Sequence, residues 1–167
     1  AIAFAVAGWL PRLGPQPPPP QPVVVEKIVE PPPPPAPAER LARLESVAEA
    51  TRAIPWTTTE DPWVDSVDGR VVWNNELQEG YMTFAGLPRN DPTEHRYQLW
   101  IFDATRDDRF PVDGGIFDVA AEDAETIVPI EAKLPVGEPT LFAVTLEGPD
   151  GVVVSDREHI LVVAQVN

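Results

Sequence analysis

The residues of this chain that could do chemistry are few. There is no cysteine, which excludes disulfides, thiolate metal sites and cysteine nucleophiles. The acidic stretch DATRDDRFPVDGG offers hard oxygen donors of the kind that calcium prefers. Its spacing is not that of a loop with calcium ligands at alternating positions, and two arginines stand among the acids. Salt bridges and solvation are the simpler interpretation, and the alternative is a calcium site formed by Asp103, Asp107, Asp108 and Asp113.

Serine and histidine chemistry has one candidate, the stretch SDREH at Ser155–His159. Residues this close along a strand point to alternating faces, whereas the members of a catalytic triad must converge. We therefore interpret this stretch as a solvated strand edge. His95 and His159 stand alone, and a zinc site needs three or four convergent ligands. The second acidic cluster is interpreted as a solvated loop and consists of Glu122, Asp123 and Glu125.

Aromatic rings are numerous for a domain of this size. Rings on one face of a sandwich can bind sugars, but their burial is the usual way in which a small domain without disulfides gains stability. We therefore expect the tryptophans of the folded part in the core, above all Trp100: Trp56, Trp63, Trp73 and Trp100.

Charge is distributed unevenly. The formal net charge is −15, and all of it falls on residues 55–167, because the first 54 residues carry five acidic and five basic side chains. A globular part this acidic repels the phosphates of nucleic acids and anionic lipid headgroups. Binding of DNA or RNA is therefore not expected.

Composition divides the chain into four segments. Residues 1–10, AIAFAVAGWL, are apolar throughout and are expected to be the end of a transmembrane helix, with the remnant of a signal sequence as the alternative. Residues 11–37 hold 13 of the 22 prolines and predict an extended linker, because such a segment cannot form a packed core. Residues 38–54 predict an amphipathic helix, and residues 55–167 predict a folded domain.

The predicted helix carries an apolar stripe at helical spacing, with Leu41 and Leu44 at its centre and Thr51 near its end. A helix this short is marginal alone, so Leu41 and Leu44 are expected to dock on the folded domain. A two-stranded coiled coil is the rival, but two heptads are too few to favour it.

From Trp56 onward the pattern predicts strands. GRVVWN and GYMTFAGLP form a hairpin candidate. Further apolar runs follow, separated by Gly, Pro and Asp turns and with no helices between them: HRYQLWIFD, GGIFDVA, TIVPI, TLFAVTLE, VVVS after the turn GPDG, and HILVVAQV. This pattern predicts an all-β fold, an antiparallel β-sandwich of the immunoglobulin-like, Greek-key type.

The stretch RYQLWIFD, Arg96–Asp103, is apolar on both of its alternating faces. A strand in a two-layer sheet normally shows one polar face to water, so this strand must be covered twice. We expect the second sheet on one face and the helix of residues 38–54 on the other. The predicted core consists of Tyr97, Leu99, Trp100, Ile101, Phe102, Phe117, Phe142 and Val144.

The order and spacing of several motifs resemble one known family. The motifs are GYMTFAGLP, YQLWIFD, DGGIFDV, AKLPVGEPTLFAVTLEGPDGVV and a closing ILVVA. Over residues 73–164 the chain resembles the extracytoplasmic C-terminal domain of anti-sigma-K-type factors. Members of that family carry a short strand and a Gly-Leu-Pro turn before a Tyr-Gln-Leu-Trp strand.

The resemblance implies a non-catalytic regulatory domain of a single-pass, membrane-anchored anti-sigma factor, with the folded domain on the extracytoplasmic (periplasmic) side. Family members hold a sigma factor inactive through a cytoplasmic N-terminal domain, and stepwise proteolysis frees it. That inhibitory domain would lie upstream of Ala1. The expected partners are the sigma factor, the membrane and regulatory proteases, and no cofactor is expected.

Two other classes of function compete with this expectation. The alternative is an envelope-exposed binding module for a glycan or protein ligand, in which the rings of Trp63 and Tyr81 contact the ligand. A hydrolase with paired carboxylates is the third class, and nothing in the spacing of the acids supports it.

Overall fold

The computed structural model describes Gly14 and residues 34–47, 49–120 and 125–167. The chain divides into two units, Ala1–Pro33 and Pro34–Asn167. The expected transmembrane segment of residues 1–10 and most of the proline-rich linker lie outside the described residues. Within the described part of the chain, no helix is long and apolar enough to cross a membrane.

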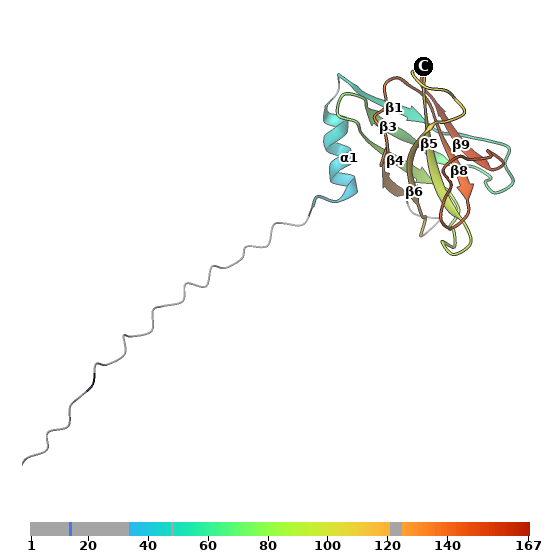
Figure 1. Cartoon of the computed structure of the whole chain (residues 1–167), viewed down its shortest axis with the longest axis horizontal. Helices are drawn as coiled ribbons and strands as arrows, with labels where there is room; N and C mark the ends of the chain where they lie inside the picture. Colours follow the sequence, from blue (N-terminus) through green and yellow to red (C-terminus); the bar gives the residue numbers. More distant parts are fainter. Residues whose placement is uncertain (1–13, 15–33, 48, 121–124) are drawn as a thin grey trace, which may run out of the picture. The chain divides into compact units, whose positions relative to one another are not determined.

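The unit Pro34–Asn167 is mostly β-structure. Its strands pair antiparallel in two sheets, with the orders β1-β3-β4-β7 and β2-β9-β8-β5-β6. Figure 1 shows the sheets lying against each other, with α1 beside β3 and β4. The predicted antiparallel β-sandwich is confirmed at this level. The elements are α1 (Pro37–Ser46), β1 (Thr51–Pro55), β2 (Thr57–Thr58), β3 (Asp68–Asn74), β4 (Glu79–Ala85), β5 (Arg96–Asp103), β6 (Val112–Phe117), β7 (Thr126–Pro129), β8 (Pro139–Glu147) and β9 (Ile160–Gln165).

The main core lies between the two sheets. β5 and β8 are neighbours in one sheet, where Leu99 lies beside Val144 and Ile101 beside Phe142, and all four side chains are fully buried. A run of stacked rings crosses from one sheet to the other, with centroids 5.3 to 5.5 Å apart. This run consists of Trp56, Phe84, Phe117 and Tyr97.

Segments that pass from one sheet to the other bridge both edges of the sandwich. At one edge the chain leaves β1 at Trp56, whose indole N–H donates to the carbonyl of Thr83, and continues into β2 of the other sheet. At the other edge, after β7, the backbone N–H groups of Glu131 and Lys133 donate to the carbonyls of the β6 residues Gly114 and Asp113. The two sheets are thereby held in one layered unit.

Helix α1 is shorter than the predicted helix of residues 38–54. It ends at Ser46, and Thr51–Pro55 forms β1 instead, paired with β3. Thr51 fits the helical spacing, but its backbone lies opposite Asn74 and its hydroxyl group contacts the carbonyls of Val47 (2.6 Å) and Leu44 (3.2 Å). A β-branched residue gains more from this ladder than from another helical turn.

Leu41 and Leu44 dock α1 on the folded unit, but not over β5. They pack against Val72, Tyr81 and Ile127, which lie on the outer face of the four-stranded sheet. The expectation that this helix covers the second face of β5 is therefore wrong. The helix follows its own strand, because β1 is an edge strand of the four-stranded sheet and begins only a few residues after α1.

The outer face of β5 is covered by residues 148–159, between β8 and β9, which we name the strap. The side-chain amide of Gln98 pairs with the backbone of Val152 in both directions, at 3.0 and 2.9 Å. The strap approaches so closely at Gly151 that a Cβ there would collide with Ile116. The expected strand VVVS does not form. The backbone of Val152 pairs with the side chain of Gln98 instead of a neighbouring strand, and Val153 is exposed.

Phe102 is a correction to the predicted core. The other seven predicted core residues are buried, whereas Phe102 is only half-buried. It lies on the outer face of β5, where the strap covers its ring with the guanidinium of Arg157, 5.1 Å from the ring centroid. The charged guanidinium keeps part of its surface hydrated, so a ring that it covers stays partly open to water at this end of β5.

Candidate functional site

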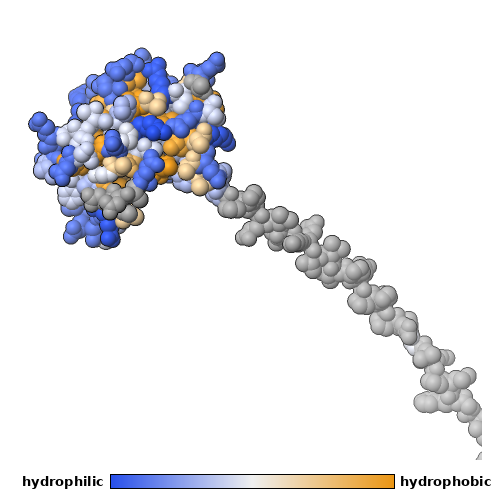
Figure 2. Space-filling view, turned by 180° about the vertical axis from the view of Figure 1, so that it is seen from behind, coloured by the Kyte–Doolittle hydropathy of each residue, from blue (hydrophilic) through white to orange (hydrophobic). Residues whose placement is uncertain are grey.

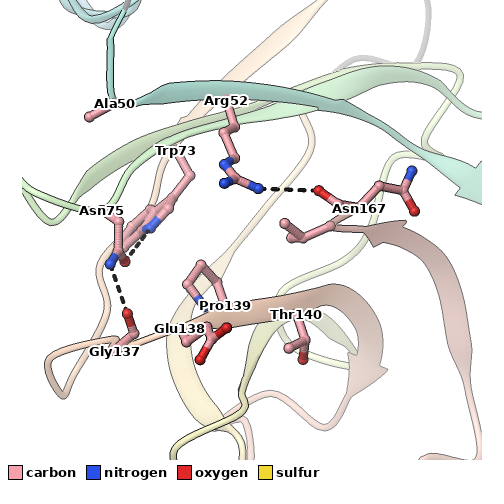
Figure 3. Close-up of a pocket in the computed structure, with 10 residues that line it drawn as sticks. Ala50, Arg52, Trp73, Asn75, Gly137, Glu138, Pro139, Thr140 and Asn167 are labelled. Atoms are coloured by element: carbon pink, nitrogen blue, oxygen red, sulfur yellow. Dashed lines mark hydrogen bonds between the residues drawn. The ribbon is translucent and has the colours of Figure 1, made fainter.

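The candidate site is a groove at one edge of the sandwich, where β1 and the end of β9 separate (Figure 3). It consists of two adjoining hollows of about 320 and about 440 Å³. Arg52, Val166 and Asn167 line both hollows, so they form one continuous groove.

Two strand edges border the groove. β2 pairs with β9 only at Val162 and Val163, and in the described part of the chain no strand pairs with β9 beyond Val163 on that side. β1 is likewise paired only with β3 among the described strands. Such edges offer backbone N–H and C=O groups to an extended peptide, which can add as a further strand. Pro55 lacks a backbone donor and limits such pairing at one end of β1.

Hydrogen bonds hold several polar side chains of the groove in place. The Trp73 indole donates to Asn75 (3.1 Å), and the Asn75 amide donates to the carbonyl of Gly137 (2.8 Å). The Arg52 guanidinium spans the groove and donates to the carbonyl of Asn167 (3.2 Å), as Figure 3 shows. Glu138 adds a carboxylate. The residues that line the groove include no serine, cysteine or histidine that could pair as nucleophile and base.

Asp103, one of the calcium candidates, anchors the wall of this groove. Its buried carboxylate accepts the N–H groups of Gly137 (2.7 Å), Thr105 (2.9 Å) and Glu138 (3.0 Å), and the hydroxyl of Thr105 (2.8 Å). Burial alone would raise the pKa of Asp103, but these hydrogen bonds outweigh it and hold the pKa well below its ordinary value. Asp103 therefore stabilises a loop junction as a carboxylate.

The structure does not bring the four calcium candidates together. Asp107 pairs with Arg109, 2.6 Å from Oδ2 to Nη2, and Asp113 accepts the N–H of Gly115 (2.8 Å). Asp108 contributes its backbone carbonyl to Arg157. Within the described ranges, no three acidic or histidine side chains gather as a metal site would require. Glu122 and Asp123 of the second acidic cluster lie outside the described residues.

Ser155 and His159 contact different acids. Ser155 donates to Glu147 Oε1 (2.6 Å), which also accepts the hydroxyl of Thr145 (2.6 Å). Thr145 in turn accepts the indole N–H of Trp100 (2.9 Å). His159 Nδ1 lies 3.0 Å from Asp61 Oδ2. The first three contacts form a largely buried polar network that fastens the strap to β5 and β8, a role that sequence reasoning missed.

The predicted ligand-contacting rings differ in exposure. Trp63 is 38% exposed, so its expected place in the core is wrong. Its indole donates to the Tyr97 hydroxyl (3.2 Å), and its ring lies 5.6 Å from that of His95. Tyr81 is fully buried beneath α1, so its expected role as a surface ring is wrong. Figure 2 shows apolar residues interrupted by hydrophilic ones on one face of the unit, which is ordinary for a folded surface.

No protein-family model matches the chain, and no curated protein and no solved structure is significantly similar to it. The function proposed below therefore rests on the motifs of the sequence and on where the structure places them.

Replacing Asp103 by Asn tests the anchor at the groove. The amide cannot accept all the N–H groups that the carboxylate accepts, so we expect the free energy of unfolding at neutral pH to fall by about 2–3 kcal/mol. Urea denaturation measures this, with Asp108→Asn as the control on an exposed side chain in the same loop.

The same comparison has a defined pH dependence. Because the pKa of Asp103 is lower in the folded protein than its unfolded value of about 3.9, its contribution is fully present above about pH 4 and is lost as the pH falls through the folded pKa. The difference between wild type and Asp103→Asn should shrink in acid. A difference that stays constant with pH contradicts the role of the carboxylate.

Proposed function

We propose that the unit Pro34–Asn167 is the extracytoplasmic regulatory domain of a single-pass, membrane-anchored anti-sigma factor. In this proposal residues 1–10 end a transmembrane helix, the proline-rich segment is a stalk, and the domain is an immunoglobulin-like, Greek-key sandwich. A cytoplasmic part of the same protein, encoded upstream of Ala1, binds the sigma factor. The domain itself performs no catalysis and controls when proteases release the sigma factor.

One observation supports this proposal above the others. Four of the five motifs that carry the resemblance fall on β5, β6, β8 and β9, which are neighbours in the sheet order β9-β8-β5-β6, and the fifth, GYMTFAGLP, falls on β4 of the other sheet. The motif residues GPDGVV at 148–153 begin the strap that covers this sheet. Most of the resemblance therefore concerns one connected piece of structure, the sheet that the strap covers.

The physical character of the unit fits a domain that shields against proteolysis. Buried strands with paired backbones open only at a large free-energy cost, and a protease needs an extended, accessible backbone. Most of β5 is buried, with partners on both sides, β6 and β8. A cut is therefore expected outside the sandwich, in segments that are not held in a sheet.

The test is an in-frame deletion of the codons for Trp56–Asn167 in the full-length gene of the native bacterium. We expect the transcripts that depend on one sigma factor to change several-fold, because proteolytic control of the inhibitor is lost. Leu134→Ala, which alters an exposed side chain, serves as the control. Unchanged sigma-dependent transcription in the deletion strain would refute the proposal.

A binding module for an envelope glycan is the second candidate, and the exposed ring of Trp63 favours it. A sugar ring can stack on such an indole face. If this candidate holds, the purified chain is retained by cell-wall glycan in a pulldown, Trp63→Ala abolishes retention, and Trp63→Phe keeps part of it. Equal retention of wild type and Trp63→Ala eliminates this ring as the contact.

A further inference from the structure

Helix α1 rests on a small apolar cluster that is separate from the main core. This cluster contains Leu41, Leu44, Val72 and Tyr81, with Ile127 packed against it. None of these residues belongs to the cluster between the two sheets. Removing α1 therefore takes no side chain out of the core that holds the sandwich together.

The other contacts of α1 with the sheet lie at its surface. Arg40 is 3.6 Å from Glu79, and Glu45 is 2.7 Å from Arg70, with side chains between 30 and 46% exposed. Ion pairs this exposed stabilise a contact only slightly. The Arg40 guanidinium also lies 5.5 Å from the centre of the Tyr81 ring. Two leucines thus provide most of the attachment.

The helix itself adds little resistance to detachment. It has ten residues, and no side chain caps its N-terminus by a hydrogen bond. A helix of this length is marginal in water without a surface to pack on. Detachment and unwinding of α1 are therefore expected to be one step, and the cost of ordering ten residues favours that step.

α1 covers two large side chains that are fully buried on the outer face of the sheet, where side chains are usually exposed to water. Val72 and Tyr81 are both fully buried although they point away from the main core. Burial, together with the hydrogen bond from its hydroxyl to Glu79 (2.8 Å) and the charge of that carboxylate, raises the pKa of Tyr81 to about 12. Without α1, this valine and this phenol ring would face water.

α1 lies in the chain between the proline-rich segment and the first strand. α1 directly follows the proline run that ends at Pro35 and precedes β1, which pairs with β3 over five residues. A pull on the chain before Pro37, or a partner bound there, acts on α1 before it acts on any strand. The packing of α1, which is weaker than the pairing of β1 with β3, is thus the first contact that such a force would break.

We propose that α1 is a detachable cover: it leaves the four-stranded sheet and unwinds while the sandwich stays folded, and this exposes Val72, Tyr81 and the backbone of α1. The detached state offers a protease an extended segment next to an intact domain. This device is independent of the function proposed above, because it follows from the packing of α1 alone.

Hydrogen exchange measured by mass spectrometry on the 167-residue chain tests this proposal. In the wild type, amides of α1 should exchange at least about tenfold faster than those of β5 and β8, as expected for a local opening below global unfolding. Leu44→Asp should remove the remaining protection of α1 and raise exchange in β3 and β4 near Val72 and Tyr81, while β5 and β8 keep their protection. Ala42→Asp is the matched control, because it places the same charge on an exposed position of the same helix.

Two results would overturn the proposal. One is the loss of protection in β5 and β8 together with α1 in Leu44→Asp, which would make the helix part of the cooperative fold. The other is wild-type exchange in α1 as slow as in β5. Neither result bears on sigma-dependent transcription, so the detachable cover and the proposed function can fail separately.

Discussion

The burial of β5 on both faces is the constraint around which the unit is arranged. Its inner side chains meet the four-stranded sheet, and its outer face carries Gln98, Trp100 and Phe102, which the strap covers. A strand with no polar face is stable only if both covers are present. The strap satisfies this with polar contacts as well as apolar ones: the amide of Gln98 pairs with backbone, and the indole of Trp100 reaches Glu147 and Ser155 through Thr145.

Each sheet therefore has its own outer cover, and the two covers differ in how they are held. The strap is continuous with β8 and β9 and is fastened by hydrogen bonds that would leave buried polar groups unsatisfied if it moved. α1 is joined to the sandwich at one end only and is held mainly by Leu41 and Leu44. This difference links the fold to the proposed regulation, since one cover belongs to the cooperative domain and the other can separate from it.

Much of the fold could be predicted because most of its strands carry a local sequence pattern. Alternation and turn residues predicted the β3–β4 hairpin and the strands from β5 to β9. β1 was missed because Thr51 also fits a helical stripe, and only pairing with distant Asn74 decides its state. The docking place of α1 and the buried state of Tyr81 depend on the same long-range arrangement. The Asp103 anchor was hidden because its partners at 137 and 138 are backbone groups, which carry no sequence signal.

The most direct test of this account is the stability of a chain whose strap residues 152–157 are replaced by a glycine–serine linker of equal length. If the strap is the second cover of β5, the free energy of unfolding in urea falls by about 3 kcal/mol or more, because glycine at 155 and 157 removes the hydroxyl that donates to Glu147 and the guanidinium over Phe102, and the more flexible linker no longer holds the backbone at 152 against Gln98. An unfolding free energy equal to that of the wild type would show that the outer face of β5 needs no cover, and would contradict the account.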